Sequence, residues 1–240
     1  MEDYSQLYEN NIKMLNHAIE CCNEPLSHED LINELASDND IKKQLCIIEI
    51  KELKSQHEAD LLVYNLTEKS TPVRELTSYK ISELIKNPDY SGFFQSNKIL
   101  DTFTLAITDI NPAISRNTTE IIKYIKNTDY LAKNIINAVN ITLNSMQDIK
   151  QNHSYIANKK NFNLYWNLEA LTVLADKIKI DEDIISIIET TYKSNDYTVR
   201  EKTAKLISYL KSESFNNIAE ILKNDDNIYV RKYFNDYDII

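Results

Sequence analysis

The stretch Asp196-Tyr197-Thr198-Val199-Arg200 decides how this chain folds, because its last two residues recur twice elsewhere in the sequence. Val-Arg is found again at Val73-Arg74 and at Val230-Arg231, and each copy stands at the start of a segment whose apolar residues have helical spacing. A dipeptide that recurs at helix starts predicts an internal repeat. The architecture can therefore be predicted before any question of catalysis is asked.

The repeat extends beyond the dipeptide. When Val73 is aligned with Val199, four inward positions of the two helices coincide: Thr77 with Thr203, Ser78 with Ala204, Ile81 with Ile207 and Leu84 with Leu210. Successive starts lie about 31 to 33 residues apart at three places: Ile41 to Val73, Trp166 to Val199 and Val199 to Val230. This period predicts units of two helices each.

The composition favours an all-α protein. One glycine, Gly92, and four prolines leave little material for tight β-turns, while Leu, Ile, Lys, Glu and Asn supply helices and their caps. Repeated helix pairs bury their apolar faces against their neighbours, so a stack of them forms one continuous domain. We expect residues 1–37 to form an N-terminal helical cap and residues 38–240 to form the repeats.

Over residues 38–240 the sequence resembles the HEAT-repeat family, whose units are antiparallel helix pairs with an Asp…Val-Arg signature. The resemblance implies a right-handed α-solenoid of about five to six HEAT-like helix pairs. It departs from the family pattern at 111–125 and 161–178, where Val-Arg is missing. The middle of the stack is therefore expected to be irregular.

The resemblance also assigns a role to the arginines, which in this family reach an acidic residue of a neighbouring unit. It implies that Arg200 and Arg231 form such a ladder with Asp196 and Asp226 as the acids. Arg74 occupies the arginine position but has no Asp before it. We expect the three arginines to hold units together rather than to bind a ligand.

The net charge of the chain and its lack of long apolar segments limit the classes of partner and the cellular compartment that we expect. A net charge of -10 repels phosphate backbones and anionic lipid surfaces, which argues against nucleic acid and membranes. The sequence shows no apolar stretch near the roughly 20 residues that span a bilayer and no signal-peptide pattern at Met1. We expect a cytoplasmic protein with reduced thiols at Cys21, Cys22 and Cys46.

No motif points to catalysis. The histidines His17, His28, His57 and His153 are scattered, and neither a zinc motif nor a phosphate-binding glycine loop is present. We therefore expect no metal, no cofactor and no catalytic residue. Two HEAT-like enzyme classes stay open as alternatives because the resemblance extends to them: alkylpurine DNA glycosylases and bilin lyases. A glycosylase would need a basic, aromatic groove, whereas Trp166 is expected to lie in the core.

The resemblance implies that second helices line a concave surface, where partners of solenoids bind. After removal of their apolar stripes, the exposed candidates for binding are Asp101, Asn134, Asn137, Glu189, Lys193 and Glu220. This polar, mildly acidic set suits a basic protein partner, with charge guiding the encounter. We expect a non-catalytic adaptor, inhibitor or assembly factor.

Three further expectations concern aromatic and terminal segments. The segment 87–94 is expected to be a loop that packs against the repeats, and Tyr79, Tyr165 and Tyr209 are expected to be half-buried. The apolar segment 233–240 either folds back over the fifth unit or pairs with another chain. A monomer is expected, and self-association through this segment is the alternative.

Overall fold

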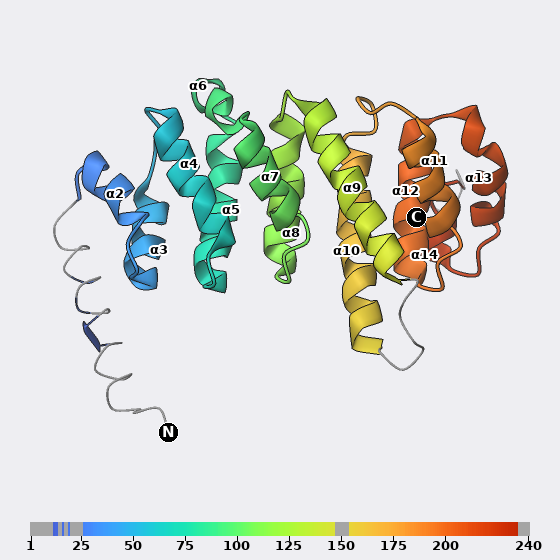
Figure 1. The fold of residues 1–240 in the computed structure, drawn as a ribbon, viewed down its shortest axis with the longest axis horizontal. Coiled ribbons are helices and arrows are strands. Elements are labelled where there is room, and N and C mark those ends of the chain that lie inside the picture. Colours follow the sequence, from blue (N-terminus) through green and yellow to red (C-terminus); the bar gives the residue numbers. More distant parts are fainter. Residues whose placement is uncertain (1–11, 14–15, 17–18, 20–25, 147–153, 235–240) are drawn as a thin grey trace. The chain divides into compact units, whose positions relative to one another are not determined.

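The computed structural model describes residues 12–13, 16, 19, 26–146 and 154–234. These residues form α-helices and short 3-10 helices, and none of them lies in a β-strand. The all-α class is thereby confirmed (Figure 1). No helix in the described part of the chain is both long enough and apolar enough to cross a membrane.

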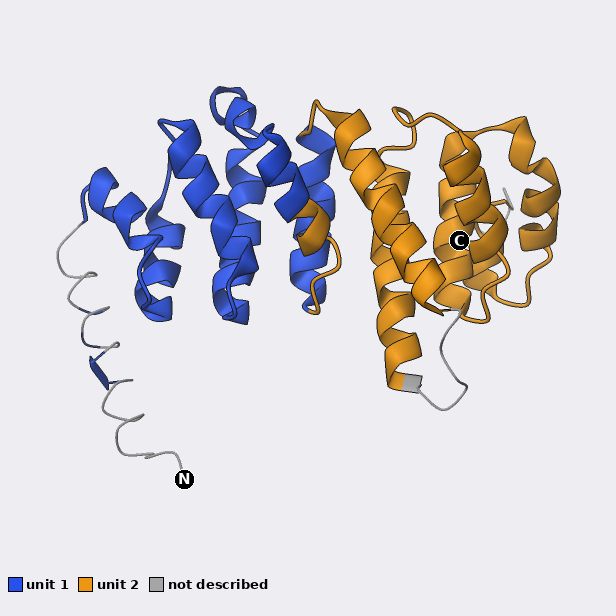
Figure 2. Ribbon diagram, in the orientation of Figure 1, with its two compact units in different colours: residues 1–102, 111–124 blue, residues 103–110, 125–240 orange. Residues whose placement is uncertain are grey.

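The chain divides into two compact units, which are coloured separately in Figure 2. Unit 1 comprises residues 1–102 and 111–124, and unit 2 comprises residues 103–110 and 125–240. In chain order, the helices alternate between two sets. We call α3, α5, α8, α10, α12 and α14 the first helices, and α4, α7, α9, α11 and α13 the second helices.

Unit 1 is organised around three first helices, α3 (Asp40–Glu49), α5 (Thr71–Leu84) and α8 (Pro112–Ile121). α3 packs against α5, and α5 packs against α8. The other α-helices are α2 (His28–Glu34), α4 (Gln56–Tyr64), α6 (Pro88–Ser91) and α7 (Asn97–Ala106), the last of which ends in unit 2. Short 3-10 helices are η1 (Asn65–Thr67), η2 (Gly92–Phe94) and η3 (Ile122–Tyr124).

Unit 2 repeats this arrangement. Its first helices are α10 (Ser154–Val173), α12 (Tyr197–Leu210) and the short α14 (Ile228–Arg231), and α12 packs against the other two. The second helices are α9 (Thr128–Met146), α11 (Glu182–Thr191) and α13 (Asn216–Lys223), with η4 (Glu213–Phe215) before α13. α11 contacts both α9 and α12. The first helices are thus stacked in chain order within each unit.

The starts of the helices follow from the sequence. A side-chain carboxylate or carboxamide accepts a hydrogen bond from the backbone N–H two residues later, which satisfies one of the unpaired donors of the first turn. Such caps are Asn39, Asn87, Asn111, Asp196 and Asn227. Ser27, Ser55 and Asp181 cap three residues ahead instead. Each cap stabilises its helix by about 1 kcal/mol.

The core confirms most of the expected inward positions. Val73, Ile81, Val199 and Ala204 are fully buried, and so are Thr77, Ser78 and Thr203 of the aligned pairs. The buried hydroxyls cost little, because Thr77 donates to the Val73 carbonyl and Thr203 to the Val199 carbonyl. Trp166 is also buried, with edge-to-face contacts to Phe162 and Tyr165, as predicted.

Two local predictions were wrong. The segment 87–94 was expected to be a loop but is helical, because Asn87 and Pro88 start α6, and η2 follows at once. Packing of its aromatics was predicted correctly for Phe94, which is fully buried. Tyr79 and Tyr209 were expected to be half-buried but are 60% and 57% exposed, because they lie on the outer face of α5 and α12.

Several sequence predictions fall outside the described residues. They concern Cys21, Cys22, His17, His153 and most of the first 25 residues and of segment 233–240. Cys46 is described; it is buried and forms no disulfide with a described residue, as expected for a core cysteine.

Candidate functional site

The three Val-Arg arginines share one local contact. Each guanidinium folds back to the loop before its own helix and donates to the carbonyl six residues earlier in the chain. The contacts are Arg74 Nη1 to Glu68 O at 2.9 Å, Arg200 Nη1 to Ser194 O at 2.9 Å and Arg231 Nη1 to Asp225 O at 2.6 Å. The arginine therefore closes the turn that leads into each of these first helices.

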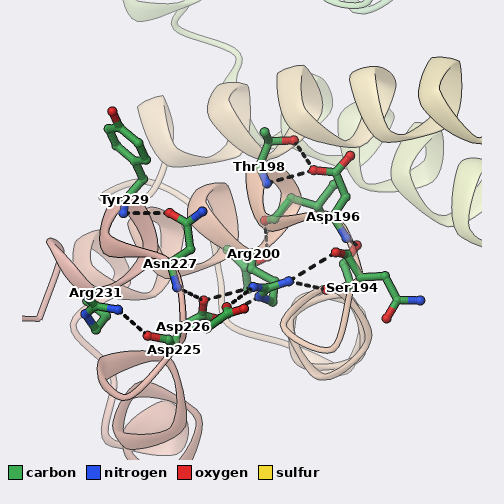
Figure 3. A network of polar contacts seen from close by, with 12 residues as sticks. Ser194, Asp196, Thr198, Arg200, Asp225, Asp226, Asn227, Tyr229 and Arg231 are labelled. Carbon is green, nitrogen blue, oxygen red and sulfur yellow. Dashed lines mark hydrogen bonds and ion pairs between the residues drawn. The ribbon is translucent and has the colours of Figure 1, made fainter.

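Arg200 also connects two repeats (Figure 3). Its Nε donates to Asp225 Oδ2 at 2.6 Å and its Nη2 to Asp225 Oδ1 at 2.9 Å, which is a two-point arginine–carboxylate pair. Nη2 also contacts Asp226 Oδ1 at 2.8 Å, although the Asp226 side chain is 89% exposed. The hydrogen bond from Arg200 holds the pKa of Asp225 down to about 2.

A cation–acid contact with the same residue spacing occurs in unit 1. Lys43 stands four residues after the cap of α3, as Arg200 does after the cap of α12. Its Nζ pairs with Glu68 Oε1 at 2.6 Å, and Glu68 stands two residues before Ser70, the residue that precedes α5. In both units, a cation four residues after one N-cap position thus meets an acid two residues before the N-cap position of the next first helix.

The predicted ladder acids need a correction. Arg200 does reach Asp226, but its principal partner is Asp225, which sequence alignment to Asp196 did not single out. Asp196 instead caps α12, accepting from Thr198 N at 2.9 Å and from Asn161 Nδ2 at 2.9 Å. The cause is geometric, because the capping carboxylate of Asp196 is turned toward the start of its own helix, whereas Asp225, two residues before the cap of α14, is turned toward Arg200 of the preceding repeat.

The first helices α10 and α12 are joined by a second charged cluster. Glu169 pairs with Lys202 at 2.9 Å and with Lys205 at 2.6 Å, and Lys202 Nζ lies 4.4 Å from the centre of the Tyr165 ring. Burial would lower the pKa of Lys202, but its contacts with Glu169 and Tyr165 outweigh burial and raise it. This cluster holds structure together and leaves Lys202 charged.

The six predicted binding residues lie on or beside second helices. Asp101 is on α7, Asn134 and Asn137 are on α9, Glu189 is on α11, Glu220 is on α13, and Lys193 is in the turn after α11. All are exposed except Asn134, which is half-buried. Asp101 belongs to unit 1 and the other five belong to unit 2. Their role in binding stays a prediction.

A groove of about 560 Å³ lies in unit 2 beside Lys193, the one predicted residue that lines it. Its walls come from the second half of α9, the first half of α10, the end of α11 and the start of α12. Leu143, Met146 and Ala157 supply apolar surface, while asparagine, serine and threonine side chains supply most of the rest. A cavity of this size is typical of ligand-binding sites.

The groove lining is almost uncharged. Lys193 and Asp196 are its only ionisable side chains among the described residues, and Asp196 already accepts from Thr198 and Asn161. No group of three or more His, Cys, Asp or Glu side chains in the described part of the chain could hold a metal ion. The groove is therefore suited to a neutral hydrogen-bonding group.

Sequence reasoning missed the asparagines that line this groove. Asn140 and Asn144 on α9 are absent from the predicted binding residues, although they continue the line begun by Asn134 and Asn137. Spacings of three, three and four residues place all four on one side of a helix. That spacing was the signal that could have found them.

A second, smaller pocket of about 260 Å³ lies at the start of α10. It is bordered by Ile110 and Tyr155, whose side chains are 72% and 73% exposed, and by Phe162. Exposed apolar residues of this kind occur on many protein surfaces, so this pocket alone indicates no ligand.

Comparisons with known proteins add little. No protein-family model matches the sequence, and no curated protein matches it. Among solved structures, the crystal structure of an engineered protein from the Northeast Structural Genomics Consortium is similar, with 14% sequence identity and a TM-score of 0.43. The match covers 85% of this chain and 92% of that chain. A similarity at this level carries no argument about function.

Proposed function

We propose that this protein is a non-catalytic binding scaffold, an adaptor, inhibitor or assembly factor that recognises a partner protein on the surface formed by its second helices. The groove that the second helices α9 and α11 form together with parts of the first helices α10 and α12 carries this proposal. It offers apolar area and many neutral hydrogen-bonding groups, a combination that protein interfaces use. The proposal includes a cytoplasmic location and a right-handed α-solenoid of HEAT-like pairs, in which second helices would line the concave face.

The stacking within each unit supports the solenoid. First helices pack on first helices in chain order, and a recurring cation–acid contact links successive repeats at Lys43–Glu68 and at Arg200–Asp225. Contacts limited to neighbouring repeats are the defining property of this class of architecture.

Charge supports a basic partner. The chain carries a net charge of -10, and exposed Glu189 and Glu220 lie on second helices of unit 2. Such a surface attracts cationic proteins at long range and repels nucleic acid. We expect charge to accelerate the encounter while the groove provides most of the affinity.

The enzyme alternatives receive less support. A DNA glycosylase would need a basic groove with aromatic side chains, but among the described residues the groove lining contains one cation, Lys193, and no aromatic side chain. Trp166 is 9% exposed and packs between Phe162 and Tyr165. A bilin-lyase-type factor would need a deep apolar cleft, whereas much of this lining is polar.

Site-specific photo-crosslinking tests the proposal. A benzophenone amino acid is placed at Asn137, Glu189 or Glu220 on second helices, and at Tyr79 or Tyr209 as equally exposed controls on first helices. After irradiation in cells that express the protein, crosslinked chains are identified by mass spectrometry. We expect the same partner at the second-helix positions and its absence at the controls.

The proposal is tested by comparing crosslinking at the second-helix positions with crosslinking at the first-helix controls. Crosslinks to one partner only from Tyr79 or Tyr209 would place binding on the first helices and refute the proposal. Equal crosslinking from every position would indicate nonspecific contact and would refute it as well.

A further inference from the structure

We infer that the groove bounded by α9 to α12 holds an extended segment of the partner protein by hydrogen bonds to its main chain, made by the carboxamides of Asn140 and Asn144. This inference rests on the proposed function and specifies how the partner is bound. The occupant is thus a strand-like peptide whose side-chain sequence contributes less to recognition than its backbone.

The chemistry of the lining supports this occupant. A carboxamide has two N–H donors and one carbonyl acceptor, and a peptide group has one donor and one acceptor, so the two can pair at two points. The Asn140 and Asn144 side chains line the groove, and neither makes a hydrogen bond to any described residue.

The spacing of the two asparagines matches an extended chain. Residues 140 and 144 are four positions apart on α9, which corresponds to about 6 Å along a helix that rises 1.5 Å per residue. Peptide groups that point to the same side of an extended strand recur about every 6.6 Å, which is two residues at 3.3 Å each. One strand could therefore present alternate peptide groups to Asn140 and then to Asn144.

The charges of the lining argue against other ligands. Among the described residues of the lining, a phosphate would meet one cation, Lys193, and Asp196 lies in the same lining. A cationic side chain would find that Asp196 already accepts from Asn161 and Thr198. A neutral peptide backbone is the chemical complement of this surface. Leu143, Met146 and Ala157 would contact the side chains that point into the groove.

A selection from a displayed library of random 12-residue peptides provides the probe. The full-length protein is used as bait, and the best synthetic peptide is measured by calorimetry against the wild type, Asn140→Ala, Asn144→Ala and the double variant. Asn217→Ala on α13 is the matched control, because Asn217 is an exposed helical asparagine that does not line the groove. Circular dichroism checks the fold of each variant, which alanine in a helix preserves.

We expect the double variant to weaken peptide binding about tenfold or more, since each lost hydrogen bond is worth about 0.5 to 1.5 kcal/mol. Asn217→Ala should leave the affinity unchanged. An extended peptide has two alternating sets of main-chain nitrogens, which point to opposite sides. N-methylation of the set that faces the asparagines should abolish binding, and N-methylation of the other set should have little effect. Raising salt should change the affinity of an uncharged peptide by less than about twofold.

Three outcomes would overturn the inference. They are a selection that yields no peptide, a selected peptide that binds the double variant as tightly as the wild type, and a peptide that tolerates N-methylation at every position. None of these three outcomes would refute the proposed function if a partner protein were still crosslinked at the second-helix positions. If that partner bound there but ignored both asparagine substitutions, only the peptide inference would fail.

Discussion

At the scale of single residues, Arg200 combines two functions that a lysine could not. Its planar guanidinium donates to carbonyls of its own loop through Nη1 and to Asp225 through Nε and Nη2. Arginine has five donors in a fixed plane, whereas lysine presents one compact charge. Lys43 in unit 1 accordingly makes the contact with the next repeat, at Glu68.

Replacement of Arg200 should therefore reduce stability more than replacement of an ordinary surface arginine. We expect Arg200→Ala to lower the free energy of unfolding by about 2 to 3 kcal/mol and Arg200→Lys by about 1 kcal/mol, since charge-assisted bonds are lost to different extents. Urea unfolding followed by circular dichroism measures both. Arg116→Ala on α8 is the control, and its exposed side chain should make a change within about 0.5 kcal/mol. Equal effects at both arginines would contradict this role.

The Arg200–Asp225 pair should also make stability depend on pH. The pKa of Asp225 is lowered from 3.8 to about 2 in the folded protein, so the folded state favours the ionised carboxylate. The resulting stabilisation is present above about pH 4 and is lost as pH falls toward 2. We expect wild type to exceed Asp225→Asn in stability by about 1 to 2 kcal/mol at pH 6, with the difference shrinking toward zero near pH 2. A difference that stayed constant from pH 6 to pH 2 would exclude this explanation.

At the scale of helices, the sequence predicted where helices begin better than it predicted which of their side chains are exposed. Asp196 and Asn111 are capping residues whose effect is local, so their helices begin where they were expected. Tyr79 was misplaced because its exposure depends on which side of α5 meets α3 and α8, and that choice requires the tertiary packing. Asn140 and Asn144 were missed for the same reason, because a polar residue on a helix becomes informative only when a groove lies beside it.

The packing of α10 against α12 depends on the Glu169 cluster. Glu169→Ala would leave Lys202, whose side chain is only 8% exposed, without its carboxylate partner. We expect a loss of about 3 kcal/mol, typical of a buried charge that is left unpaired. The double variant Glu169→Leu with Lys202→Met should recover most of this loss, because apolar residues of similar size replace both charges. Thermal unfolding of the single and double variants measures the coupling, and additive effects would show that the two residues act independently.

At the scale of the whole molecule, the fold class was predictable and the function was less so. Repeat spacing and composition are properties of the entire sequence, so Val73, Val199 and Val230 sufficed to predict stacked helices. Binding specificity depends on a few side chains that the fold brings to one site, as it brings Asn144 of α9 and Asn161 of α10 to the lining of the groove. The predicted set of exposed residues contained only Lys193 from that lining.

The net charge of the molecule leads to a prediction about nucleic acid. We expect no mobility shift of a random DNA duplex at about 10 μM protein and about 0.1 M salt, conditions under which many DNA-binding proteins bind nonspecifically. The charge of -10 provides the reason, since it repels the phosphate backbone. A control with a basic DNA-binding protein verifies the assay. A salt-sensitive shift would favour the glycosylase alternative.

The contact between each Val-Arg arginine and the loop before it has a consequence for how such a chain grows. Donor and acceptor lie within seven consecutive residues, as in the segment from Glu68 to Arg74. A duplication that copies this segment would copy the complete contact, so a new repeat would begin with its turn already closed. The Arg200–Asp225 contact, in contrast, needs an acid supplied by the following copy. When repeats are added by duplication, the contact that closes the turn is therefore copied with each repeat. The contact between neighbouring repeats can change independently of it.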